Sequence, residues 1–189
     1  VWVYLGDDTN PYTVFDFTES RKRDGPVNFL GNFKGFLQAD AFSGYDCIFA
    51  GGDVVEVACW AHARRKFFEA LSTNSTACNE ALKMIQELYL VEKETAEKTA
   101  DERLAERQAK SVATLKRFKA WLDNQKVVAL PKSPLGKAVT YALNNWDALC
   151  TFVENGSLSI DNNRSERALR GMAVGRKNWM FLGSAAGGK

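Results

Sequence analysis

The stretch GFLQADAFSGYDCIFAGGDVVEVAC, residues 35–59, decides the fold of this protein. It begins with a short apolar run, Gly35 to Ala39, which ends at Asp40, and it finishes with the run Val54 to Cys59, which is rich in β-branched residues. Both runs predict short strands, whereas the residues between them suit a short helix followed by a turn at Gly51-Gly52. The stretch therefore predicts an α/β fold.

The pattern continues toward the N-terminus. Residues 1–5 (VWVYL) and 12–17 (YTVFDF) are rich in β-branched and aromatic residues, and the intervening GDDTNP is a cluster of turn formers. Together they predict a β-hairpin. After a polar joint, residues 26–33 suit a short helix. The predicted order up to Cys59 is therefore strand, strand, helix, strand, helix, strand.

The second half of the chain has the apolar periodicity of helices. One apolar stripe runs through residues 82–89, and a second, charged helix starts at Leu104 and ends near Gln125. The Glu- and Lys-rich run at residues 92–110 contains a break or bend and is predicted to be a solvated helix surface.

The clearest helix is predicted for residues 134–154, which keep a single apolar face. Ser133-Pro134 marks its start and Asn155-Gly156 its end, because proline is favoured in the first turn of a helix and glycine just after the last. A further helix is expected after Gly156, and residues 178–182 are the one later candidate for a strand.

The composition is that of one or two globular domains. Of the 189 residues, 46% are hydrophobic and 25% are charged, which excludes a wholly disordered, collagenous or membrane-embedded chain. No stretch approaches the roughly 20 apolar residues of a membrane span, and residues 1–5 lack the basic flank of a secretory leader. Because four irregularly spaced cysteines are unlike a disulfide framework, we expect reduced thiols and a cytoplasmic location.

Charge is distributed unevenly along the chain. Residues 1–60 carry 4 basic and 9 acidic side chains, whereas the remainder carries 21 basic and 14 acidic ones. The segment 161–189 alone holds 6 basic and 2 acidic residues, together with Trp179 and Phe181. This distribution fits a polyanionic partner, and the alternative is a solvated basic face without a ligand.

Three common kinds of catalytic site have no support in the sequence. Cys59 and His62 in CWAHARRK offer two zinc ligands where a structural site needs four, and no second pair follows. The lone histidine has no nucleophile turn of the Gly-x-Ser-x-Gly type to work with, and no phosphate-binding glycine loop is present. We therefore expect neither a zinc site, nor a hydrolase triad, nor a nucleotide-hydrolysing loop.

Asp40 is the first candidate for chemistry. It stands at the C-terminal end of a predicted strand, and open sheets place ligand-binding and catalytic groups at that edge. The alternative is an aspartate that starts a turn or caps the next helix.

Glu166 is the second candidate. In DNNRSERALR, residues 161–170, it lies where a new helix should start, with arginines at 164, 167 and 170 beside it. One carboxylate among guanidinium groups suits a metal ligand next to phosphate-binding arginines, and it equally suits a surface network of ion pairs. If Asn163 is the N-cap, Glu166 completes a capping box and needs no function.

The run GRKNWMF, residues 175–181, interleaves basic and aromatic residues. Such a run suits contacts to a nucleic-acid backbone together with base stacking. The alternative is a terminal strand whose aromatic side chains fill the core.

Four blocks in the same order resemble the insertion-sequence-66 type of bacterial transposase. They are LQADAFSGY around Asp40, CWAHARRKFFEAL from Cys59, KSPLGKAVTYALNNWDAL in the clearest helix, and IDNNRSERALRGMAVGRKNWMFLGS near the end. The blocks span most of the chain, and residues 73–128 match only loosely, as a variable insertion would.

The resemblance implies a ribonuclease-H-like core of the DDE class, in which two aspartates and one glutamate hold two divalent metal ions, Mg²⁺ or Mn²⁺, for phosphoryl transfer on DNA. Asp40 matches the family's second acidic residue and Glu166 its third, so both are expected to be catalytic metal ligands. Two metal ions about 3.5–4 Å apart activate the attacking oxygen and stabilise the leaving oxygen, and they need carboxylates from separate elements.

The resemblance also implies a DNA interface and a missing strand. The residues expected to contact DNA are His62, Arg64, Arg65, Arg164, Arg167, Arg170, Arg176, Lys177 and Trp179. The family's first aspartate lies on a strand before the hairpin, so the first core strand of the mixed α/β sheet is expected to precede Val1. Asp7 and Asp8 in the hairpin turn are not expected to replace that aspartate. We therefore expect a catalytic-domain fragment that is inactive alone.

The expected organisation is a ribonuclease-H-like core over residues 1–66, a helical insertion over residues 67–132, and a helical return to the core over residues 133–189. The implied function is to cleave and join DNA ends during transposition of an insertion sequence in the bacterial cytoplasm, with a homo-oligomer on paired ends. The alternatives are a DNA-binding or assembly module without catalysis, and a ribonuclease-H-like nuclease.

Overall fold

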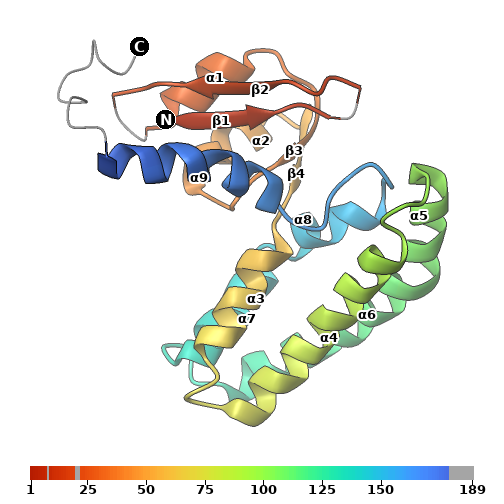
Figure 1. Ribbon diagram of the computed structural model, residues 1–189. Coiled ribbons are helices and arrows are strands. Elements are labelled where there is room, and N and C mark those ends of the chain that lie inside the picture. Colours follow the sequence, from red (N-terminus) through yellow and green to blue (C-terminus); the bar gives the residue numbers. More distant parts are fainter. Residues whose placement is uncertain (8, 20–21, 179–189) are drawn as a thin grey trace. The chain divides into compact units, whose positions relative to one another are not determined.

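The computed structural model (Figure 1) describes residues 1–7, 9–19 and 22–178. These residues divide into two compact units. The first unit is made of Val1–Gly35, Phe42–Val54 and the segment from Asn162 onward, and the second is made of Phe36–Ala41 and Val55–Asp161. No helix within the described ranges is both long and apolar enough to cross a membrane.

Short strands and helices alternate in the first third of the chain, and helices alone follow in the rest of the part that the structure describes. In chain order the elements are β1 (Trp2–Leu5), β2 (Thr13–Asp16), α1 (Asp24–Leu30), β3 (Gly35–Gln38), the 3-10 helix η1 (Ser43–Tyr45), α2 (Asp46–Phe49), β4 (Val54–Val57), α3 (Trp60–Glu69), α4 (Ser75–Glu94), α5 (Ala100–Glu106), the π-helical turn η2 (Arg107–Ser111), α6 (Val112–Val128), α7 (Pro134–Asn144), α8 (Trp146–Cys150), the 3-10 helix η3 (Thr151–Val153) and α9 (Asn163–Asn178). The predicted order of strands and helices up to Cys59 is confirmed, and so is the mixed α/β class.

The first unit is built on the hairpin of β1 and β2. These strands pair antiparallel, with Trp2 opposite Asp16. Trp2 is buried, and its indole nitrogen donates to the Thr18 hydroxyl at 2.9 Å. Tyr4 of β1 stacks on Phe29 of α1 with ring centroids 3.7 Å apart, and α9 runs along β1 (Figure 1). Tyr4 thus attaches α1 to the hairpin.

The strands β3 and β4 pair in parallel. The amide of Gly35 donates to the carbonyl of Asp53, and four residues later in both strands the amide of Ala39 donates to the carbonyl of Val57. Because the bonded residues advance by four in the same direction along both strands, the pair is parallel, and a parallel pair needs a crossover connection. Here η1 and α2 supply that connection. The C-terminal ends of β3 and β4 therefore lie at the same edge.

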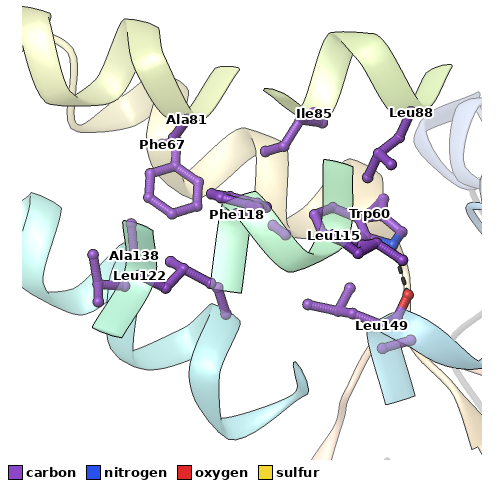
Figure 2. Close-up of a cluster of buried hydrophobic side chains, with 14 of the residues drawn as sticks. Trp60, Phe67, Ala81, Ile85, Leu88, Leu115, Phe118, Leu122, Ala138 and Leu149 are labelled. Carbon is purple, nitrogen blue, oxygen red and sulfur yellow. Dashed lines mark hydrogen bonds between the residues drawn. The ribbon is translucent and has the colours of Figure 1, made fainter. Parts of the chain in front are cut away.

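The core of the second unit is helical (Figure 2). Trp60 and Phe67 of α3 are fully buried, and their rings lie 5.8 and 5.9 Å from the ring of Phe118 of α6. The Trp60 indole nitrogen donates to the Leu149 carbonyl at 2.7 Å, so the polar atom of this side chain is satisfied inside the core. In this unit α4 lies beside α6, and α3 beside α7 (Figure 1). The apolar stripes predicted from the helical period are the packed faces.

The helix predicted over residues 134–154 is divided. Its start is confirmed, because the Ser133 hydroxyl accepts a hydrogen bond from the Gly136 amide and caps α7. The division falls at Asn145, whose side-chain amide donates to the Tyr141 carbonyl at 2.8 Å. Asparagine side chains compete in this way for backbone groups and favour helix ends. The apolar face continues across the division, which is why the periodicity predicted a single helix.

The prediction of a solvated helix surface over residues 92–110 is wrong in part. The expected break is present, and α5 begins at Ala100, earlier than predicted, after a capping box between Thr99 and Glu102. Arg107, however, is fully buried and pairs with Glu92. Composition indicated solvent exposure because charged residues are rarely buried unless they are paired, and the pairing is visible only in the fold.

Candidate metal and nucleic-acid site

Asp40 lies two residues beyond the end of β3, at the edge where β3 and β4 both end. Its side chain is half-buried. The next helix, η1, has Phe42 at its N-cap. The predicted position of Asp40 just after the C-terminal end of a strand is confirmed.

The residue after Asp40 is conformationally strained. Ala41 has φ 56°, the left-handed conformation that side chains other than glycine rarely adopt. Such a residue costs about 1–2 kcal/mol and persists only where the surrounding structure imposes it. Residues of this kind cluster at active sites and ligand clamps. The strained residue thus lies directly beside the candidate carboxylate.

The Tyr141 phenol and the carboxylates of Asp40 and Glu56 belong to the second unit and interact electrostatically. Burial raises the pKa of Tyr141 to about 12, with further contributions from electrostatic interaction with Cys59, Asp40 and Glu56. The Tyr141 hydroxyl is buried and has no hydrogen-bond partner among the described residues. The Lys66 ammonium lies 5.0 Å from the centre of the Tyr141 ring. Tyr141 thus interacts electrostatically with both Asp40 and Glu56, and Lys66 lies over its ring.

The first set of predicted DNA contacts lies on α3. His62 is half-buried, whereas Arg64 and Arg65 are exposed. The Arg64 guanidinium lies 6.0 Å from the centre of the Phe68 ring, and Phe68 is 57% exposed. Neither Arg64 nor Arg65 forms an ion pair with a carboxylate of the described residues. Their charges are therefore available to phosphate groups.

Glu166 lies in the first turns of α9. This helix begins at Asn163, and the carbonyl of Asn162 accepts hydrogen bonds from the amides of Ser165 and Glu166. Asn162 is therefore the N-cap residue, and Glu166 is the fourth residue of the helix. A capping box needs its acidic residue at the third position, so the alternative with Asn163 as N-cap is not realised.

The side chains of Glu166, Arg164, Arg167 and Arg170 are exposed. Their spacing places the arginines on successive turns of α9, with Arg170 one turn beyond Glu166. A carboxylate near a helix N-terminus is favoured by the partial positive charge there.

The remaining predicted DNA contacts follow later in the chain. Arg176 and Lys177 belong to the last turn of α9. Trp179 lies outside the described residues. So does most of the predicted strand at residues 178–182, of which Asn178 is the last residue of α9.

The donor atoms of the candidate residues suit a hard divalent cation. Mg²⁺ and Mn²⁺ prefer carboxylate oxygens, which Asp40, Glu56 and Glu166 supply. Across residues 1–7, 9–19 and 22–178, no three His, Cys, Asp or Glu side chains come together as a complete metal site. Asp40 belongs to the second unit and Glu166 to the first. Their joint role as metal ligands stays a prediction.

Sequence reasoning missed Glu56 and Tyr141. Glu56 carries a local signal, because it is the one charged residue in the apolar strand VVEVAC beside the candidate aspartate. Tyr141 carries none, since it sits among the apolar residues of a helix face, and only the fold places it near Asp40.

Comparisons with known proteins identify relatives in Sinorhizobium fredii (strain NBRC 101917 / NGR234). The chain is 31% identical over 210 residues to the uncharacterized protein y4hP. This alignment covers 99% of this chain and 38% of that protein. It is 34% identical over 206 residues to the uncharacterized protein y4qI, and this alignment covers 100% of this chain and 38% of that protein. The chain thus spans about two fifths of the length of these relatives. No solved structure matches. A family model described as "Transposase IS66 family" matches residues 1–189.

Proposed function

The chain belongs to the IS66 family of transposases, and on this basis we propose that it forms part of a DDE catalytic domain that cleaves and joins DNA ends during transposition of an insertion sequence. Asp40 and Glu166 are the proposed catalytic residues and metal ligands. The proposed substrates are transposon ends and target DNA in the bacterial cytoplasm, with a homo-oligomer acting on paired ends.

The observation that carries the proposal is the place of Asp40. This carboxylate follows a strand of a parallel pair, at the edge where such sheets bind ligands, and the strained Ala41 comes directly after it. A left-handed residue directly beside a candidate carboxylate is a feature that recurs at active sites and ligand clamps.

The proposed mechanism assigns separate tasks to the side chains. Asp40 and Glu166 hold divalent cations, which when bound supply the charge that activates an attacking oxygen and stabilises the leaving oxygen. Arg64 and Arg65 on α3, and Arg164, Arg167 and Arg170 on α9, bind phosphate groups of the DNA. His62, Arg176, Lys177 and Trp179 complete the proposed interface.

The finer architecture is also proposed. The described strands form two separate two-stranded sheets, β1–β2 and β3–β4. We infer that both belong to a ribonuclease-H-like core over residues 1–66, followed by a helical insertion over 67–132 and a helical return to the core over 133–189. The first catalytic aspartate is assigned to a further strand outside this chain. The relatives support this, because the matched region is 38% of their length and leaves room for such a strand.

The test is metal-dependent cleavage of DNA carrying transposon ends by the full-length protein. We expect Asp40→Asn and Glu166→Gln to abolish cleavage without weakening DNA binding. The matched control is Asp123→Asn, which removes an exposed carboxylate paired with Lys119 in the insertion. Full cleavage by both site variants would reject the proposal.

The same assay separates the alternatives. A transposase joins a DNA 3′ hydroxyl to a target strand, whereas a ribonuclease-H-like nuclease yields only hydrolysed ends. A DNA-binding module without catalysis shows salt-sensitive binding that is indifferent to Mg²⁺ and yields neither product.

A further inference from the structure

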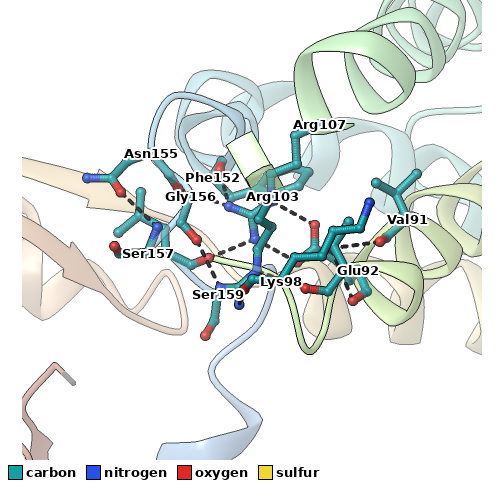
Figure 3. A network of polar contacts seen from close by, with 12 residues as sticks. Val91, Glu92, Lys98, Arg103, Arg107, Phe152, Asn155, Gly156, Ser157 and Ser159 are labelled. Carbon is teal, nitrogen blue, oxygen red and sulfur yellow. Dashed lines mark hydrogen bonds and ion pairs between the residues drawn. The ribbon is translucent and has the colours of Figure 1, made fainter. Parts of the chain in front are cut away.

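The segment that leads into α9 has little secondary structure of its own. Within residues 152–161, called here the return segment, the amide of Leu158 donates to the Asn155 carbonyl and that of Ser157 to the Asn155 side chain. A segment with so few internal hydrogen bonds takes its shape from the groups that hold it. In the second unit those groups come mainly from the helical insertion (Figure 3).

Arg107 is the centre of this attachment. Its guanidinium donates to the carbonyls of Phe152 and Asn155 at 2.7 and 2.9 Å and to that of Leu158 at 2.8 Å. Two further donors form a bidentate pair with Glu92 at 2.8 and 2.6 Å. All five N–H donors of the side chain are therefore used, and the side chain is fully buried. Lysine cannot reproduce this planar arrangement.

Arg103 and a close backbone contact add to the attachment. Arg103 donates to the Gly156 carbonyl at 2.9 Å and to the Lys98 carbonyl at 3.3 Å (Figure 3). Gly156 lies directly against the backbone of α5, because a Cβ atom there would stand 1.8 Å from the Ala100 carbonyl oxygen. Gln108 donates to the Val153 carbonyl at 2.7 Å. Insertion side chains thus hold five carbonyls of the return segment.

The end of the return segment is held as well. The Tyr89 hydroxyl, from α4, donates to the Asp161 carboxylate at 2.9 Å. On the other side, Gln38 donates to the Ser159 carbonyl at 2.7 Å, two residues before Asp40 in the chain. The return segment is therefore bonded both to the insertion and to the strand that precedes Asp40. Asp161 is followed immediately by Asn162, the N-cap of the helix that carries Glu166.

We propose that Arg103, Arg107 and Tyr89 are positioning residues, which fix the return segment up to Asp161 and thereby stabilise the first turn of α9, the helix that carries Glu166. This rests on the proposed function of Glu166. The insertion is then part of the catalytic apparatus and not only a variable surface. Its contacts go mainly to backbone carbonyls, so they specify the path of the return segment whatever side chains it carries.

The experiment compares Arg103→Met and Tyr89→Phe in the full-length protein, with Arg117→Met as the matched control. Arg117 is an exposed arginine of the same insertion that bonds Glu87 and Thr114 and not the return segment. Hydrogen exchange is measured at the first-turn amides of α9, Ser165 and Glu166. Cleavage of transposon-end DNA is measured against Mn²⁺ concentration.

We expect Arg103→Met and Tyr89→Phe to speed exchange at these amides about tenfold or more, which corresponds to a loss of about 1.4 kcal/mol in local stability. They should also raise the Mn²⁺ concentration for half-maximal cleavage severalfold, while Arg117→Met changes neither. Arg107→Lys keeps the charge but loses the planar fork, and it should behave like Arg103→Met.

Unchanged hydrogen exchange in Arg103→Met, Tyr89→Phe and Arg107→Lys would overturn the inference. Faster hydrogen exchange with an unchanged Mn²⁺ requirement for cleavage would overturn it as well, because the contacts would then have a structural effect alone. If cleavage survives Glu166→Gln, the proposed function of Glu166 is rejected. The insertion is then not part of the catalytic apparatus. The exchange data separate these two failures, because they do not depend on the reaction.

Discussion

At the scale of single residues, the strained Ala41 gives the sharpest prediction. Replacing it by glycine removes the steric cost of φ 56°, so we expect Ala41→Gly to raise the free energy of unfolding by about 1 kcal/mol. Ala50→Gly is the matched control, because Ala50 has φ −60° and gains nothing from glycine. Urea denaturation of the three proteins measures the difference. A less stable Ala41→Gly would show that the left-handed conformation carries no strain here.

Single residues also show where composition misleads. Gly156 was predicted to end a helix through its backbone freedom, yet its role is the close approach of two backbones at Ala100. Arg107 was assigned to a solvated run, yet it is fully buried with every donor satisfied. In both residues the deciding partner lies far away along the chain, so no local pattern reveals it.

At the scale of elements, the junction of α5 and η2 predicts a pH dependence. Hydrogen bonds from Lys98 and Lys110 lower the pKa of Glu106 from 4.5 to about 2. A carboxyl whose pKa is lower in the folded state stabilises the fold above its unfolded pKa, and this contribution is lost as the pH falls from 4.5 toward 2. We expect Glu106→Gln to flatten the acid-induced loss of stability within this window.

The measurement is the midpoint of urea unfolding at several pH values across that window. Glu97→Gln, which removes an exposed glutamate of the same region, is the control and should follow the parent protein. If Glu106→Gln also tracks the parent, solvent screening has cancelled the two exposed ion pairs, as is common for surface pairs.

At the same scale, the elements differ in how far local patterns predicted them. The hairpin, the strand pair around residues 35–57 and the start of α7 at Ser133-Pro134 follow from turn formers, alternation and capping, which act over a few residues. The division at Asn145 and the π-helical turn at Arg107–Ser111 were not predicted. At both places side chains bond to backbone groups, Asn145 to Tyr141 and Arg107 to the return segment, and periodicity does not register such bonds.

At the scale of the whole molecule, the uneven charge predicts salt-dependent DNA binding. Arg64 and Arg65 are exposed and without carboxylate partners among the described residues. Each phosphate contact contributes about 0.9 to the slope of log K against log salt concentration, so Arg64→Ala with Arg65→Ala should lower that slope by about 2.

The matched control changes two cations of the insertion that already have carboxylate partners, Lys110→Ala with Lys119→Ala. Fluorescence anisotropy with labelled DNA at several salt concentrations measures both slopes. If both double variants lower the slope equally, binding reflects net charge alone and α3 is not a specific interface.

Several properties of this protein were determined by its sequence alone. The α/β order, the hairpin, the position of Asp40 after a strand and the membership in the transposase family all follow from local patterns and from motifs that stand in the chain. They were predictable because turn preference, alternation and capping act between neighbours, and because a motif needs no coordinates to be recognised.

Only the tertiary structure decided what surrounds those motifs. It brought Tyr141 into electrostatic interaction with Asp40 and Glu56, it gave Ala41 its left-handed conformation, and it buried Arg107 against the return segment. Each of these depends on groups that are distant in sequence and close in space. The physical reason is that burial and hydrogen-bond satisfaction are properties of the packed chain. A charged residue is therefore predicted from sequence to be solvent-exposed, and only the fold shows the partners that allow its burial.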